Sequence, residues 1–177
     1  MFAFLLLTSC DADNTYQIPW KLFYVPSNGM FPTLTTNDKF LAVRKPLVNE
    51  GDLQRGDIVL YKNLHKGKEY TFVWRLVGLP GDTVITNNTS LFVNDVELKH
   101  TKIKEDEEYN YIQEEHGTSS YILVYKKQPD PKRRPNMTIQ VPDGHMFLMG
   151  DNRDGAYDNR YTGTVELTNM IGKKVKW

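Results

Sequence analysis

Residues 72–84 read FVWRLVGLPGDTV and contain the pattern that decides the fold. The run from Phe72 to Gly78 is rich in aromatic and β-branched side chains, which is typical of a strand. Pro80-Gly81-Asp82 indicates a tight turn in which the glycine can take a positive φ. A second strand-like run begins at Asp82. The stretch therefore predicts two strands joined by a short turn.

The same pattern recurs from Lys39 onward, where short runs of alternating or β-branched residues are separated by Gly, Pro, Asn and Asp. No stretch has the 3.6-residue period of a helix. We expect a mainly β, antiparallel fold that resembles a barrel or a sandwich. The runs are KFLAVRK (39–45), GDIVLYK (56–62), YTFVWRLVG (70–78), DTVITNN (82–88), SLFVNDVEL (90–98), SYILVYKK (120–127), MTIQVPD (137–143) and HMFLMGD (145–151).

The strand pattern also divides the chain into segments, because it is weaker in some stretches than in others. Residues 1–16 have the composition of a signal and tether, and residues 17–177 form one domain of ordinary size. Between residues 99 and 137 the chain is more charged and less patterned, which predicts a small inserted lobe. The core of the domain would then comprise residues 20–98 and 138–177.

Composition excludes several classes of function. The 22 basic residues balance the 22 acidic ones, so there is no basic excess to bind nucleic acid. One cysteine, Cys10, permits neither an intramolecular disulfide nor a cysteine-based metal site, and the four histidines show no ligand spacing. DNRDGAYDN, from Asp151, superficially resembles a calcium loop, but Arg153 and Thr162 stand where ligands are required. We expect no metal and no cofactor.

The first ten residues, MFAFLLLTSC, are apolar but shorter than the ~20 residues of a membrane-spanning helix. Leu7-Thr8-Ser9-Cys10 resembles the bacterial lipoprotein box, in which the cysteine carries the lipid, and Asp11 resembles the signal for retention at the inner membrane. A core strand with a free thiol is the alternative. No Lys or Arg precedes Lys21, although export signals normally begin with positive charge.

Four stretches in order resemble one family, the type I signal peptidases, serine endopeptidases that remove signal peptides from exported proteins. They are VPSNGMFPTL, LQRGDIVLYK, FVWRLVGLPGDTV and MFLMGDNRDGAYDNRYTG. The similarity runs from Tyr24 to the C-terminus. It implies a mostly antiparallel β fold with a catalytic core and a variable inserted lobe.

The resemblance also implies a catalytic dyad in which a serine attacks the scissile carbonyl and a neutral lysine accepts its proton. The position of the nucleophilic serine is Gly29, that of the lysine is Trp74, and that of a serine that orients the lysine is Ala156. A further serine of the last motif is replaced by Asn159. Glycine cannot form an acyl-enzyme, and an indole N–H donates a hydrogen bond but cannot accept a proton.

Other motif positions are retained, and the resemblance gives them roles. Ser27 matches the side-chain donor to the oxyanion, and Met30 and Pro32 lie in the same substrate-binding motif. Several polar positions of the last motif frame the cleft, and we expect Asp158 and Arg160 to form an ion pair. The framing residues are Asp151, Asn152, Arg153, Asp158 and Arg160.

We therefore predict a catalytically inactive relative of signal peptidase, with the Trp74 indole filling the former dyad site; an outward-facing Trp74 is the alternative. The protein would bind signal peptides or other extended peptides by strand addition. An active signal peptidase or a secretion complex would be its further partner. Its location would be the extracytoplasmic face of the bacterial inner membrane, through a lipid on Cys10.

Two other functions remain open. An active signal peptidase with a relocated nucleophile, Ser27, would lose cleavage on Ser27→Ala. A structural lipoprotein with a filled cleft would bind assembly partners but no preproteins.

Overall fold

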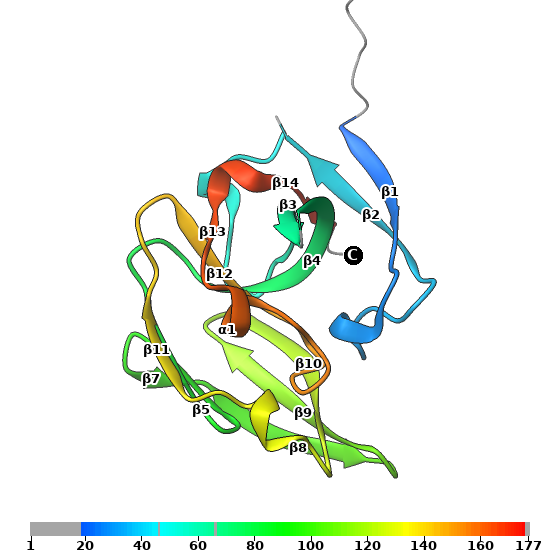
Figure 1. The fold of residues 1–177 in the computed structure, drawn as a ribbon, viewed down its shortest axis with the longest axis vertical. Coiled ribbons are helices and arrows are strands. Elements are labelled where there is room, and N and C mark those ends of the chain that lie inside the picture. Colours follow the sequence, from blue (N-terminus) through cyan, green and yellow to red (C-terminus); the bar gives the residue numbers. More distant parts are fainter. Residues whose placement is uncertain (1–18, 46, 66, 176–177) are drawn as a thin grey trace, which may run out of the picture.

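The computed structural model describes residues 19–45, 47–65 and 67–175, and Figure 1 shows their arrangement. The largest sheet is antiparallel, has seven strands in the order β1-β2-β14-β3-β4-β12-β13, and curves strongly. Its strands are β1 (Trp20–Tyr24), β2 (Lys39–Arg44), β3 (Ile58–His65), β4 (Lys68–Gly78), β12 (His145–Met149), β13 (Val165–Glu166) and β14 (Met170–Lys174).

Two smaller antiparallel sheets lie beyond it. A four-stranded sheet has the order β11-β5-β6-β7, and a three-stranded sheet has the order β10-β9-β8. Their strands are β5 (Thr83–Asn87), β6 (Ser90–Val93), β7 (Val96–Glu97), β8 (Lys99–Glu105), β9 (Tyr109–His116), β10 (Ser119–Lys126) and β11 (Met137–Gln140). The helical elements are short: α1 (Asn159–Thr162) and the 3-10 turns η1 (Asn28–Met30), η2 (Glu50–Asp52), η3 (Pro131–Arg133) and η4 (Leu167–Asn169).

The mainly β, antiparallel expectation is confirmed, and each strand-like run of the sequence contains a strand. The sequence pattern missed β1, β8, β9, β13 and β14. β8 shows why, because nearly all of its residues are exposed and its charged sequence therefore lacks an apolar alternation.

The predicted inserted lobe, residues 99–137, contains the whole three-stranded sheet, while β11 begins at its last residue and pairs with β5 outside it. The boundaries at 99 and 137 stay a prediction. The apolar start of the chain and Cys10 lie outside the described residues. Within the described ranges, no helix is long and apolar enough to cross a membrane.

The β4–β5 connection has the predicted turn. Gly81 has a φ of 85°, a conformation that an L side chain disfavours. The Asp82 carboxylate closes the turn by accepting the Leu79 amide at 2.7 Å, and it pairs with Arg55 through two hydrogen bonds of 2.9 and 2.5 Å. The turn leads β4 from the large sheet into β5 of the four-stranded sheet.

Candidate functional site

The η1 loop carries the first motif, and its backbone is fastened from across the molecule. Gly29 and Met30 are buried while Ser27 is exposed. The Asn152 amide donates to the Gly29 carbonyl at 3.1 Å, and the Asn152 side chain donates to the Asn28 carbonyl at 3.2 Å. The first and last motifs are therefore joined at the loop's centre.

Trp74 lies in the middle of β4, opposite Val59 of β3, and only 8% of its surface is exposed. The indole belongs to the same apolar cluster as Met30 and Ala156. Its N–H makes no hydrogen bond of ordinary geometry, although it is near enough to the Tyr61 hydroxyl to influence that group's pKa. The alternative of an outward-facing indole is wrong.

Gly29, Trp74 and Ala156 meet in space, far apart as they are in the sequence. A Cβ built on Gly29 would lie 2.5 Å from both Cη2 and Cζ3 of Trp74, and 3.9 Å from the Ala156 Cα. Real Cβ atoms essentially never approach another heavy atom within 3.0 Å. The φ of Gly29 is not in the left-handed region, so the backbone would accept a side chain there and the indole would not.

Gly150 completes this packing from the loop after β12. A Cβ at Gly150 would collide with the Ala156 Cβ, approach the Gly29 carbonyl oxygen to 2.5 Å and lie 3.1 Å from Trp74 Cζ3. We call Gly29, Trp74, Gly150 and Ala156 the indole cluster. Small residues at three of its positions leave room for the indole at the fourth.

The chemistry of the indole cluster is limited. Neither glycine nor alanine carries a group that attacks a carbonyl, and the indole N–H is a donor only. Nucleophilic catalysis needs a nucleophile and a base within hydrogen-bond reach, and this cluster supplies neither. Among the described residues, no group of three or more His, Cys, Asp or Glu side chains is placed to hold a metal ion.

A groove of about 430 Å³ lies beside the indole cluster, between the η1 loop and β4. We call it the front groove. Four aromatic side chains are part of its lining, and one of them, the exposed Tyr157, stacks on Tyr161 with ring centroids 5.2 Å apart. Its lining includes Ser27, Met30, Tyr70, Phe72, Trp74 and Tyr157. Pro32, predicted to bind substrate with Met30, lines a different hollow.

The front groove runs along an open strand edge. β12 pairs with β4 only between Arg75 and Gly78. The earlier part of β4 therefore has β3 on one side and, in residues 19–45, 47–65 and 67–175, no strand on the other. Both backbone groups of Leu76 face the β3 side: its amide donates to the Asp57 carbonyl, and its carbonyl accepts from the Gly56 amide. Backbone groups alternate along a strand, and therefore those of Val73 and Thr71 point to the open side.

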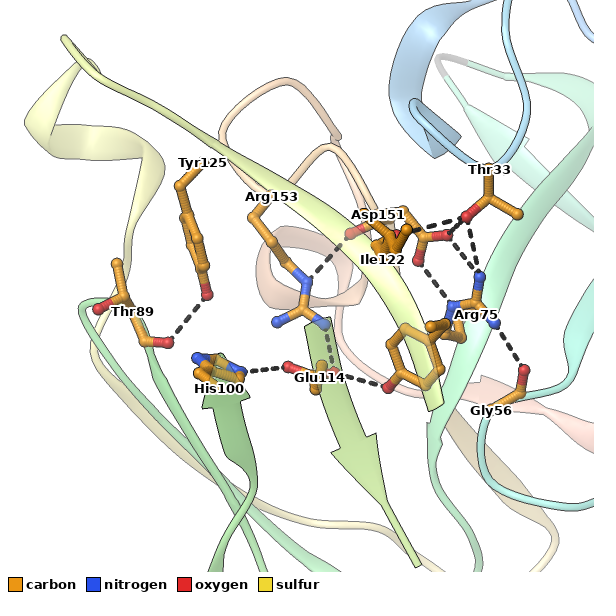
Figure 2. A network of polar contacts seen from close by, with 12 residues as sticks. Thr33, Gly56, Arg75, Thr89, His100, Glu114, Ile122, Tyr125, Asp151 and Arg153 are labelled. Carbon is orange, nitrogen blue, oxygen red and sulfur yellow. Dashed lines mark hydrogen bonds and ion pairs between the residues drawn. The ribbon is translucent and has the colours of Figure 1, made fainter. Parts of the chain in front are cut away.

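Arg75, next to Trp74 in β4, ties three segments together (Figure 2). Its guanidinium donates to both Asp151 carboxylate oxygens at 2.7 and 2.5 Å, and to the Gly56 carbonyl at 2.8 Å. Thr33, just after η1, donates to the same carboxylate at 2.5 Å. The Tyr121 ring lies 3.9 Å below the guanidinium carbon, a cation–π distance.

A second buried ion pair joins the last motif to the three-stranded sheet (Figure 2). The Glu114 carboxylate accepts from Arg153 at 2.7 Å and from the Tyr121 hydroxyl at 2.6 Å, and it lies 2.6 Å from His100. Burial alone would raise the pKa of Glu114. The Arg153 charge and the His100 contact outweigh burial and hold this pKa well below its usual range.

The third pair is the expected one. Arg160 donates to both oxygens of Asp158 at 2.9 and 2.8 Å, and to the Arg153 carbonyl at 2.5 Å. Asp158 also accepts the Gly150 amide at 2.8 Å and caps α1 through the Arg160 amide. We call these three pairs, Arg75–Asp151, Arg153–Glu114 and Arg160–Asp158, the ionic frame.

The structure thus brings together nearly all the residues singled out from the sequence. Gly29, Trp74 and Ala156 are in contact, and Ser27 and Met30 line the adjoining groove. The framing residues of the last motif surround them. Sequence reasoning missed Thr33 and Glu114 as members of this network. Thr33 lay within the first motif, whereas no sequence signal marked Glu114 in its charged strand.

Comparison with known proteins identifies one family. A family described as signal peptidase, peptidase S26, matches residues 5–177. Signal peptidase I of Pseudomonas aeruginosa is 33% identical over 178 residues, covering 85% of this chain and 62% of the relative. Signal peptidase I U of Bacillus subtilis is 32% identical over 141 residues, covering 80% of this chain and 65% of the relative.

A crystal structure of a signal peptidase I from Enterococcus faecalis V583 matches with 26% identity and a TM-score of 0.42, covering 68% of this chain and 95% of that one. The chain spans about three fifths of the length of the curated relatives from Pseudomonas, 62% in each case. Since the family match extends over almost the whole sequence, the chain belongs to the signal peptidase family, peptidase S26.

Proposed function

We propose that this protein binds an extended peptide of the signal-peptide class and does not hydrolyse it. The observation that carries the proposal is the contact between Gly29 and the Trp74 indole, at the two positions that the motifs align with the nucleophile and the base. A serine side chain at position 29 is incompatible with the indole where it lies. The two replacements therefore support each other.

Loss of hydrolysis follows from the chemistry of the indole cluster. Without a nucleophile there is no acyl-enzyme, and without a base no proton is accepted. Ser27 is a hydroxyl of the groove's lining, but it is exposed and does not cap η1 with its side chain. A relocated nucleophile would need a base within about 3.2 Å, and the Ser27 hydroxyl makes no hydrogen bond to a base among the residues that the structure describes.

Peptide binding is supported by the open edge of β4. An extended segment lying in the front groove would receive hydrogen bonds from the Val73 and Thr71 amides, as a strand added to a sheet does. The apolar and aromatic wall would bury alternate side chains of that segment. Because signal peptidases act on signal peptides at the extracytoplasmic face of the membrane, we assign the same ligand class and location to this protein.

The anchor and the partners belong to the same proposal. A lipid on Cys10 would attach the protein to the membrane without a spanning helix, since a lipid chain contributes about 0.8 kcal/mol for each buried methylene. Its further partner would be an active signal peptidase or a secretion complex that presents the bound peptide. The residue pattern Leu7-Thr8-Ser9-Cys10 supports the anchor.

The binding half of the proposal is tested by fluorescence anisotropy, with the full chain in detergent micelles and a labelled signal peptide containing an Ala-x-Ala site. Val73→Pro removes an amide that faces the groove and is not used by β3. We expect it to weaken binding roughly tenfold, the equivalent of about 1.4 kcal/mol.

Thr138→Pro is the matched control. Thr138 lies on the edge strand β11. The Val141 amide bonds to the Asp82 carbonyl just before β5, so by alternation along the strand the Thr138 amide faces away from β5. We expect wild-type affinity from this variant. Failure of the wild-type protein to bind the signal peptide would overturn the proposal and favour the structural lipoprotein.

A further inference from the structure

A second hollow, of about 720 Å³, lies on the opposite face of β4 from the front groove. Successive side chains of a strand point to opposite faces. Trp74 lines the front groove, and its neighbour Arg75 lines this second hollow. We call it the rear groove. Its floor includes Thr33 and Ile58, and its walls come from β10 and from the end of β14.

One wall of the rear groove is an open strand edge. β10 pairs with β9 along one edge. On the other edge, the Val124 amide donates to the Asp151 carbonyl, and the Val124 carbonyl accepts from the Arg153 amide. By alternation, the backbone groups of Ser120 and Ile122 also face away from β9, towards the groove. Among the described residues, the Ile122 carbonyl receives a single long contact, of 3.4 Å from the Thr33 hydroxyl, which Figure 2 shows.

The charge of the rear groove is one-sided. None of its lining residues in the described part of the chain carries a carboxylate, whereas Arg75 and Lys174 carry cations. Asp151 neutralises Arg75 through two hydrogen bonds. The Lys174 ammonium donates to the Val175 carbonyl at 3.1 Å, and within the described part of the chain it has no acidic partner within 4.0 Å.

Burial and, secondarily, the nearby Arg75 charge lower the pKa of Lys174. An anion beside this ammonium would oppose both effects. The groove thus offers one uncompensated cation together with a row of backbone donors and acceptors. Its flanking hydroxyls, on Thr33, Thr118 and Ser120, are further polar partners.

We propose that the rear groove binds an extended acidic peptide segment of a partner protein. The segment would pair with Ser120 and Ile122 as a fourth strand of the three-stranded sheet, and one of its carboxylates would pair with Lys174. A small inorganic anion would use Lys174 but not the strand edge, whereas a peptide uses both. This site is separate from the front groove, so it does not rest on the function proposed above.

The test measures anisotropy with two fluorescein-labelled, amidated probe peptides, TETETET and its uncharged counterpart TQTQTQT, added to the full chain at low ionic strength. We expect the acidic probe to bind at least fivefold more tightly. Lys174→Gln is expected to weaken it roughly three- to tenfold, as loss of a partly buried ion pair does. Lys132→Gln removes an exposed lysine outside the groove and should leave the affinity unchanged.

Amide NMR locates the bound probe. Shifts of the Ser120 and Ile122 amides, without displacement by a signal peptide, support the rear groove. Shifts at Val73 and Thr71 instead, or equal affinities of the two probes, overturn it. A chain ending at Val175 as the C-terminal amide, so that no new carboxylate lies beside Lys174, tests self-occupancy. Binding of the acidic probe tighter by more than tenfold would make residues 176–177 the natural occupant and also overturn the proposal.

Discussion

The indole cluster and the ionic frame adjoin each other, since Asp158 of the frame accepts the amide of Gly150 in the cluster. They are held together by different kinds of interaction. In the indole cluster, three small residues make room for one large apolar side chain, and the single polar atom, the indole N–H, makes no hydrogen bond of ordinary geometry. In the ionic frame, buried charges are paired through two oxygens or by several donors. The indole cluster is thus held by apolar packing, whereas the ionic frame beside it is held by charge.

The comparison shows that the polar contacts that hold the η1 loop do not depend on the side chain at position 29. Asn152 holds the η1 loop through the carbonyls of Asn28 and Gly29, and Thr33 binds Asp151 just after the loop. None of these contacts uses a side chain at position 29. The shape of the front groove therefore does not require a side chain at position 29.

The largest expected effect comes from breaking the ionic frame. Asp151→Ala leaves Arg75 charged and buried without its carboxylate, and we expect the free energy of unfolding to fall by about 3–5 kcal/mol. Urea denaturation measures it. Glu69→Ala is the control, since Glu69 and Lys62 form an exposed pair and should change stability by less than about 1 kcal/mol. Equal effects would show that the frame is not a buried structural unit.

The packing of the indole cluster is tested by adding a side chain at Gly29. Gly29→Ser is expected to cost about 1–3 kcal/mol of stability through overpacking against Trp74. In a Trp74→Ala background the same substitution should cost less, with a coupling energy of about 0.5–3 kcal/mol. Additive effects of the two substitutions would contradict direct packing of the indole on Gly29.

The pH dependence of stability sharpens the role of Glu114. Its folded-state pKa is depressed, so the carboxylate contributes stability above its ordinary pKa of 4.5, and this contribution is lost as the pH falls further. Its neighbours are Arg153, His100 and Tyr121. We expect Glu114→Gln to flatten the decline in unfolding free energy below pH 4.5. An unchanged slope in that range would show that Glu114 is not held ionised.

The smallest effect is predicted two residues from Gly29. Ser27 is exposed and its side chain does not cap η1, so Ser27→Ala should change stability by less than about 0.5 kcal/mol. Thermal unfolding of Ser27→Ala and Gly29→Ala side by side compares the two positions. A larger loss at Ser27 would mean that the loop, and not the indole, determines tolerance to substitution.

Much of this architecture follows from the sequence because its signals are local. The β4 strand and the turn at Gly81 are visible in FVWRLVGLPGDTV, since buried strands and turns need particular residues. β8 was not visible, because an exposed strand takes its order from its neighbour β9 rather than from its own pattern. Likewise, the motif order identified Gly29, Trp74 and Ala156, but only the fold brings the three into contact.

Glu114 marks the limit of sequence reasoning at the site. Its side chain is fully buried among Arg153, His100 and Tyr121, although the next residue of β9 is a second glutamate and the neighbouring strand β8 is charged and exposed. A glutamate in such a strand is typical of a solvated surface. The Glu114 carboxylate is buried and paired with Arg153 only because the three-stranded sheet packs against the last motif.

The most direct test of the account is a cleavage assay on the wild-type protein. The full chain in detergent micelles is incubated in excess over a preprotein substrate, beside an active signal peptidase, and the products are identified by mass spectrometry. We predict that the substrate stays intact while remaining bound. Cleavage at the signal-peptide junction, abolished by Ser27→Ala, would contradict the account and establish a relocated nucleophile in the front groove.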